Sequence, residues 1–352
     1  MDLFAKKHSY LGVDLGTASI KVVELGNQGG QARLETYGFA ELPAEDVKFN
    51  THDKLERTAQ ALNDICTRAH VGSRKAVAAL PTFAVFTSLL NLPLMNEREV
   101  GQALTYEAKK IVPLPLEDMI LDWKVLPMAT PAVAPHRTEK TMRVLLTAAP
   151  KNLVKQYLDI FRLAKMEILS LETEAFALGR ALLGQEPSVA ILVDVGALTT
   201  DVAVVDNHIP VLNRSIDVGG VTVTKAIAQS LNIDYRRAEQ FKRDVGLTLQ
   251  ASAGGVPKII EQTLGPIVNE VKYAISLYQA ESSKPIEKLV LTGGSAFLPQ
   301  FVAYLQSIFQ LKVVIGDPWA AVSCPVDLKG VLEEIGPRFA TAIGLALREI
   351  HH

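Results

Sequence analysis

VDLGTASIKVV, at residues 13–23, recurs without gaps at residues 193–203 as VDVGALTTDVA, and this repeat decides the fold. In each copy an apolar strand ends in aspartate, a glycine turn carries small hydroxyl residues, and a second apolar strand returns. From Asp14 to Asp194 the offset is 180 residues, about half the length of the chain. A repeat of this period predicts two related lobes that each begin with the same hairpin, and it argues against a solenoid.

The composition is that of an ordinary globular protein, with 352 residues, 48% of them hydrophobic and 21% charged, enough for two or three domains. A formal net charge of −2 gives no basic surplus, so we expect no nucleic-acid partner. Cys66 and Cys324 cannot form a disulfide framework or a CxxC metal site, which favours a reducing cytoplasm. No run approaches the roughly 20 apolar residues of a membrane span.

Hydrophobic spacing predicts strands and helices in alternation along most of the chain. The expected strands include 10–14, 19–25, 32–40, 75–80, 142–149, 167–171, 189–195 and 288–292. The expected helices include 54–69, 97–110, 151–165, 173–183, 257–281 and 336–350. This alternation predicts mixed α/β sheets rather than a sandwich or a bundle.

The two repeated turns have the chemistry of a phosphate site. Gly16 lacks a side chain, so a ligand can approach the backbone there, and the hydroxyls of Thr17 and Ser19 add donors. Asp14 offers a carboxylate to Mg²⁺, through water because this ion dehydrates reluctantly. If the Asp194 turn faces the first one, the pair would grip a polyphosphate from both sides. A plain hairpin turn is the commoner explanation for either copy alone, and the gapless pair argues against it.

Two glycine pairs and one helix contain weaker candidates for ligand-binding residues. Residues 293–295, Gly-Gly-Ser, follow a buried strand, where bare backbone can pack against a flat ring or a phosphate. The Gly219-Gly220 pair precedes a helix in the same way. Glu239 and Lys242 are three apart on one helix face, where they could bind ribose and a base edge or form an ordinary ion pair. Walker, HExxH and kinase catalytic-loop motifs are absent from the sequence.

The order of these motifs resembles the superfamily of actin, DnaK-type chaperones and sugar kinases. In that resemblance the turn at Asp14 is the first phosphate loop, the turn at Asp194 is the second, and residues 291–295 match the adenosine motif. Glu174 and the helix around residues 340–346 match the two connections between lobes. The resemblance implies a two-lobed actin-like (ribonuclease H-like) α/β fold with a central nucleotide cleft.

The same resemblance implies ATP or ADP with Mg²⁺ as cofactors, the metal lying between Asp14 and Asp194 and held through water. The residues assigned to nucleotide binding are Gly16, Thr17, Ser19, Lys21, Gly196, Thr199, Gly219, Gly220, Glu239, Lys242, Gly293, Gly294 and Ser295.

Within the superfamily, the chain resembles the PilM family of type IV pilus assembly, itself similar to FtsA. The distinctive stretch is EAKKIVPLPLED at residues 107–118, followed by Leu121-Asp122-Trp123. It falls in a subdomain that PilM and FtsA insert, here expected at 83–165. The first lobe is then expected at 1–82, 166–186 and 336–352. The second lobe is expected at 187–335, with a helical subdomain at 216–281.

The PilM resemblance implies binding of the N-terminal cytoplasmic peptide of PilN beside the inserted subdomain. The chain would thereby join the PilN/PilO/PilP complex, as a cytoplasmic protein peripheral to the inner membrane. FtsA carries an amphipathic tail beyond its last core helix, whereas this chain stops directly after the helix at 342–348. We therefore expect attachment through the partner, and self-association stays open.

DnaK-type chaperones have three glycines after the second aspartate, where this chain has Gly196-Ala197-Leu198. Leu198 adds bulk near the expected γ-phosphate, and Asp194 is the single candidate for positioning an attacking water. We expect tight ATP binding with slow or absent hydrolysis. The alternatives are a polymerising cytoskeletal ATPase like FtsA or MreB and a small-molecule kinase, for which no catalytic-base motif is present.

Overall fold

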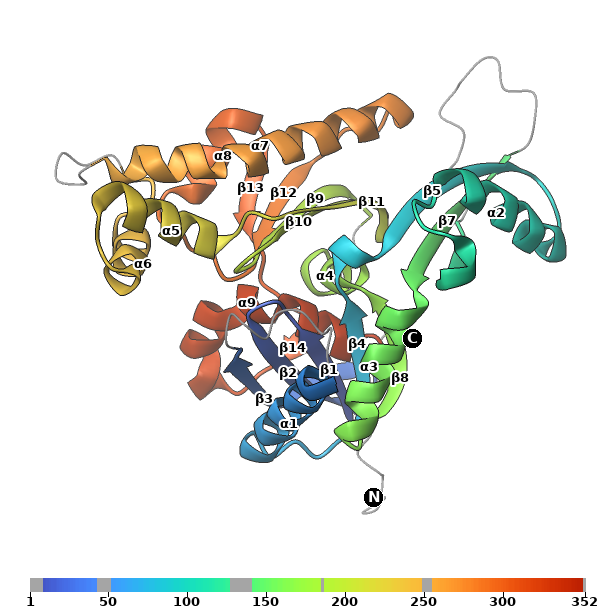
Figure 1. Ribbon diagram of the computed structural model, residues 1–352, viewed down its shortest axis with the longest axis horizontal. Helices are drawn as coiled ribbons and strands as arrows, with labels where there is room; N and C mark the ends of the chain where they lie inside the picture. The colour runs from blue at the N-terminus through green and yellow to red at the C-terminus, as the bar shows by residue number, and fades with distance from the viewer. Residues whose placement is uncertain (1–8, 43–51, 127–140, 185–186, 249–254, 351–352) are drawn as a thin grey trace.

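The computed structural model describes residues 9–42, 52–126, 141–184, 187–248 and 255–350, which form two lobes and an inserted subdomain (Figure 1). The sheet of the first lobe runs in the order β14 (Val322–Ser323), β3 (Gln31–Glu41), β2 (Ser19–Gln28), β1 (Ser9–Leu15), β4 (Lys75–Leu80) and β8 (Glu167–Thr173). β1, β2 and β3 form an antiparallel meander, and β4 adds in parallel beside β1.

The sheet of the second lobe repeats this plan. Its order is β11 (Ile209–Ile216), β10 (Thr200–Asp206), β9 (Val189–Val195), β12 (Lys288–Thr292) and β13 (Lys312–Ile315). β9, β10 and β11 form the meander, and β12 adds in parallel beside β9. The predicted duplication of the lobes is therefore confirmed. The central strands are apolar along most of their length because both faces of each sheet are covered.

Helices cover each sheet. In the first lobe, α1 (His52–Arg68) and α3 (Lys151–Leu163) pack on one face. In the second, α5 (Gly220–Leu231), α7 (Val256–Glu281) and α8 (Phe301–Phe309) cover one face, and α6 (Tyr235–Asp244) packs beside α5. Buried residues of α7 recur at helical spacing, as in Ile260, Leu264, Ile267 and Val271, and hold it on the sheet. None of the helices in the described part of the chain is long and apolar enough to cross a bilayer.

Two helices, α4 (Glu174–Leu182) and α9 (Lys329–Leu347), pack against each other and reach both sheets (Figure 1). Their contacts are made backbone to backbone. A Cβ on Gly344 would overlap the Ala177 carbonyl of α4, and a Cβ on Gly12 of β1 would overlap the Ala342 carbonyl of α9. The two lobes are thus joined around closely packed glycines.

α9 begins seven residues before the expected start at 336, because Pro337 lies inside the helix instead of marking its beginning. Proline removes one helical hydrogen bond but does not prevent the chain from continuing as a helix on both sides. The Pro337 carbonyl also accepts bonds from β12 and the turn after it, at Thr292 Oγ1 and Gly293 N, 3.0 Å each.

The inserted subdomain is a small sheet in the order β5 (Phe86–Pro93), β7 (Thr141–Pro150) and β6 (Met119–Val125), covered by α2 (Glu97–Ile111). Asn96 is the N-cap of α2, and its side chain accepts from Glu99 N in a capping box. The structure differs from the expected boundary at 165. Tyr157, Ile160 and Phe161 of α3 are buried in the core of the first lobe, so by packing the insert ends at Pro150.

Candidate functional site

The two repeated turns have the same geometry. Gly16 N donates to Ser19 O at 3.1 Å, and Gly196 N donates to Thr199 O at 3.0 Å. A Cβ at either glycine would come within 3.0 Å of that carbonyl. Thr17 and Ala197–Leu198 occupy the tips of these turns, which the two backbone hydrogen bonds close.

Each turn ends a hairpin with the same register. Asp14 pairs with Lys21 across β1 and β2, and Asp194 pairs with Asp201 across β9 and β10. Lys21 Nζ bonds Asp14 Oδ2 at 2.8 Å and lies beside the Gly16 turn. The second hairpin has an aspartate where the first has this lysine. One hairpin therefore carries an ion pair and the other carries two facing carboxylates.

Four carboxylates interact electrostatically where the lobes meet. Burial, together with the charges of Asp201 and Asp14, raises the pKa of Asp194 from 3.8 to about 7, against the opposing effect of Lys21. Burial likewise raises the pKa of Asp201 to about 6, with Asp14 contributing. Glu174 has its pKa raised by burial and then by Asp201 and Asp14. Residues 14 and 194 are thus brought together, as the sequence predicted.

Sequence reasoning missed Asp201 as a site residue and took Glu174 only as part of a connection between lobes. The signal for Asp201 was present in the repeat, because position 201 aligns with Lys21 at the same offset of 180 residues. Both hairpins have the same register, so position 201 pairs with Asp194 just as Lys21 pairs with Asp14. For Glu174, no spacing in the sequence indicated that β8 ends next to these turns.

The glycine turn after β12 reaches the same place. Gly293 has φ +87°, in the left-handed region, and a Cβ there would overlap the Asp194 carboxylate. Ser295 N donates to Val195 O at 3.2 Å, so the turn is fastened to the end of β9. Gly294 lies beside the Arg338 side chain of α9. Residues 293–295 therefore lie beside the turn that follows Asp194.

Glu239 and Lys242 lie together beside the start of α5. Lys242 Nζ donates to Glu239 Oε2 at 2.6 Å, to Thr224 Oγ1 at 2.9 Å and to Gly220 O at 3.1 Å. A Cβ on Gly220 would come within 2.7 Å of Ser295 Oγ. Gly220, Glu239, Lys242 and Ser295 thus form one polar cluster. Thr224, which sequence reasoning missed, is buried at its centre and donates to Glu239 Oε2 at 2.5 Å.

Gly219 supports the second turn from behind. A Cβ there would lie 2.6 Å from the Ala197 carbonyl oxygen. The next two amides close the contact, because Gly220 N donates to Gly196 O at 3.0 Å and Val221 N donates to Ala197 O at 2.9 Å. The first amides of α5 are therefore used by the turn, and Gly219 fixes the position of that turn.

The carboxylates suit a cation that is bound through water. Oδ1 of Asp201 is buried without a well-formed hydrogen bond among the described residues, although the Ser215 hydroxyl lies close enough to lower the pKa of this carboxyl. Within the same ranges, Lys21 is the one cation that forms an ion pair with any of the four carboxylates. No group of three or more acidic, histidine or cysteine side chains in the described part is placed as direct metal ligands. The excess of negative charge fits Mg²⁺ that keeps its water shell.

Duplicated aspartate hairpins at the meeting of two lobes, together with helices that join both sheets, define the actin-like class of proteins. A solved structure of the PilM-PilN type IV pilus biogenesis complex contains a chain that is 26% identical to this one, with a TM-score of 0.81 over 97% of this chain and 98% of that chain. Residues 12–350 match the family described as type IV pilus assembly protein PilM, and the chain belongs to that family.

More distant relatives agree with the class. The cell division protein FtsA of Neisseria meningitidis is 23% identical over 381 residues, which cover 97% of this chain and 90% of FtsA. FtsA of Bacillus subtilis is 23% identical, and the alignment covers 92% of this chain and 82% of that FtsA. The structure of MreB5 of Spiroplasma citri bound to AMPPNP has 16% identity and a TM-score of 0.53. The match covers 96% of this chain and 94% of the MreB5 chain. At that identity the likeness shows the fold alone.

Proposed function

We propose that this chain is an ATP-binding scaffold of type IV pilus assembly that binds the N-terminal cytoplasmic peptide of PilN. Family membership and the likeness to a chain of the PilM-PilN complex support the partner. The observation that carries the nucleotide part is the convergence of both aspartate turns with Glu174 and Asp201.

Different side chains of this protein would bind the phosphates, the ribose and base, and the metal ion of Mg·ATP. Thr17, Ser19 and Thr199 offer hydroxyls to the phosphates, and Lys21 offers a positive charge beside the first turn. The cluster around Glu239 and Lys242 would bind ribose and base. Asp14, Glu174, Asp194 and Asp201 would hold Mg²⁺ through water. When bound, the ion neutralises phosphate charge that these carboxylates would otherwise repel.

ATP acts in this proposal as a ligand that holds the lobes together, with slow or absent hydrolysis. Leu198 lies at the tip of the second turn, and Asp194 is the candidate to orient a water molecule. A ligand held from both lobes favours the closed arrangement only as far as it binds that arrangement better. Turnover above about 1 s⁻¹, ordinary for an enzyme, would contradict this part of the proposal.

The inserted subdomain is the proposed place of peptide binding. Large apolar side chains are exposed on it and at the junction that leads into it, namely Phe83, Leu94, Tyr106, Leu114 and Trp123. Exposed apolar surface of this kind is typical of a protein-binding face. Binding PilN there would hold the chain at the inner membrane through its partner and place it beside PilO and PilP.

Calorimetry with Mg·ATP tests the nucleotide site. We expect Asp14→Ala and Asp194→Ala to lose ATP binding while they keep a cooperative thermal transition, because each change removes a carboxylate and no apolar side chain of the core. Asp244→Ala, an exposed aspartate on α6, is the matched control and should bind ATP like the unchanged protein. Normal ATP affinity in either site variant would refute the assignment.

Fluorescence anisotropy with a labelled PilN N-terminal peptide tests the partner separately. Saturable binding is expected for this peptide, and none for a scrambled peptide of the same composition. Equal binding of both peptides, or of neither, would refute the proposed partner whether or not ATP binds.

A further inference from the structure

Thr82 joins the carboxylate cluster to the inserted subdomain. Its backbone N and its Oγ1 both donate to Glu174 Oε2, at 2.8 Å and 2.7 Å. One oxygen of Glu174 thus accepts two short hydrogen bonds from the same residue, Thr82. The two hydrogen bonds therefore fix the position of the Glu174 carboxyl relative to Thr82.

The sheet of the first lobe explains why these two residues meet. β4 and β8 are parallel neighbours, and the register pairs Leu80 with Thr173 at their carboxyl ends. After Leu80 the chain continues through Pro81 to Thr82, and after Thr173 it enters α4 at Glu174. Both residues therefore leave the same edge of the sheet side by side.

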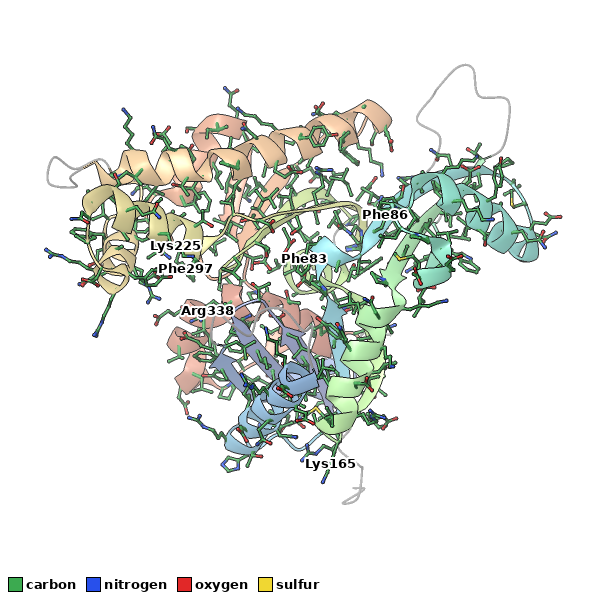
Figure 2. The ribbon with its side chains drawn as sticks, in the orientation of Figure 1. Phe83, Phe86, Lys165, Lys225, Phe297 and Arg338 are labelled. Atoms are coloured by element: carbon green, nitrogen blue, oxygen red, sulfur yellow. The ribbon has the colours of Figure 1, made fainter. Side chains whose placement is uncertain are left out.

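Thr82 is also the first residue of the segment that leads into the insert. A short helix, η2 (Thr82–Ala84), follows β4 and precedes β5. The insert joins the first lobe at two places, this segment and the Pro150–Lys151 step from β7 to α3. Figure 2 marks Phe83 on η2, between the lobes and the insert, and η2 also packs against β11 of the second lobe.

Glu174 is at the same time a member of the site. Its carboxyl lies close enough to Asp201 and Asp14, where the lobes meet, for their charges to raise its pKa. A cation placed among these carboxylates attracts Glu174 and restrains its side chain. A restrained acceptor holds the amide and hydroxyl of Thr82 more persistently, and with them the junction of the insert.

We infer that Thr82 is a positioning residue that orients Glu174 and couples the nucleotide site to the peptide-binding insert. This inference rests on the proposed function. Coupling between two ligands is reciprocal, so the peptide should alter ATP affinity by the same factor as ATP alters peptide affinity. Typical coupling between sites is about 5-fold to 150-fold.

The test measures the affinity of the labelled PilN peptide with and without saturating Mg·ATP, and the affinity for ATP alone. In the unchanged protein we expect ATP to change peptide affinity by at least about 5-fold. Thr82→Val removes the hydroxyl donor, keeps the shape and should bring that factor below about 2. Thr82→Ser restores the hydroxyl and should restore the factor. Thr87→Val, on β5 beyond the junction, is the matched control and should leave it unchanged.

The outcomes separate the inference from the proposed function. If the unchanged protein binds both ligands with no coupling, or if Thr82→Val keeps the full factor, the coupling role is overturned and the proposed function stands. If the unchanged protein binds no ATP, both are overturned. Hydrogen exchange of the unchanged protein gives a test that needs no variant. Mg·ATP should slow exchange at Thr82 severalfold, and an unaltered rate there would overturn the inference.

Discussion

Replacing Asp194 by asparagine should stabilise the nucleotide-free protein at pH 8. Burial and neighbouring charges raise the pKa of this carboxyl from 3.8 to about 7 in the folded protein. Since one pKa unit corresponds to about 1.4 kcal/mol, the ionised side chain destabilises the fold by on the order of 4 kcal/mol at pH 8. An asparagine side chain cannot ionise, so the variant avoids this penalty and loses only the interactions that the carboxylate makes.

The sign of the pH dependence follows from the raised pKa. Between about pH 4 and pH 7 the folded protein binds more protons at Asp194 than the unfolded chain does, so stability falls as pH rises through this window. From pH 6 to pH 8 the loss from this residue is about 1.3 kcal/mol. The raised pKa of Asp201 adds a smaller loss in the same direction.

Thermal unfolding of nucleotide-free protein in EDTA, at pH 6, 7 and 8, measures this effect. The unchanged protein should melt lower at pH 8 than at pH 6, by roughly 2 °C or more. Asp194→Asn should reduce this difference, and exposed Asp244→Asn should leave it as it is. Because histidines also titrate in this range, the comparison between variants carries the result. Equal pH dependence in Asp194→Asn and the unchanged protein would refute the reasoning.

Three further changes test the packing around the site. Gly344→Ala should lower the free energy of unfolding by more than about 2 kcal/mol, because its Cβ would overlap the α4 backbone. Urea denaturation measures this loss. Gly330→Ala, which lies in open space on the same helix, is the control and should change the free energy of unfolding much less. Gly293→Ala should reduce ATP affinity by at least about tenfold in calorimetry, since φ +87° disfavours a side chain there. Arg180→Lys should lower stability by about 2 kcal/mol, because lysine cannot keep both bonds to Glu172, 2.8 and 2.9 Å, and an unchanged melting temperature would contradict this.

Periodicity predicted the elements that build the site because each of them is patterned over several residues. The repeat at 13–23 and 193–203 fixed both hairpins, and α7 was expected at 257–281 and found at Val256–Glu281. Glycine turns after buried strands pointed to residues 293–295 for the same reason. These signals are local, and local signals survive in the fold when tertiary packing agrees with them.

The features that could not be predicted from the sequence depend on contacts between distant segments of the chain. Nothing local shows that α3 packs against α1 instead of the insert, since its apolar face would suit either partner. Pro337 resembles a helix boundary in the sequence, and only the structure shows the helix on both sides of it. Glu174 became a candidate site residue only through its proximity to Asp201 and Asp14, which come from distant parts of the chain.

The difference between the two matched hairpins has a directional consequence. A perfect duplication would relate the halves by a dyad and accept an elongated ligand in either sense. Lys21 in one half and Asp201 in the other break that symmetry, because one side attracts anionic groups and the opposite side repels them unless a cation intervenes. A molecule with unlike charges at its two ends would therefore lie between the halves with one polarity.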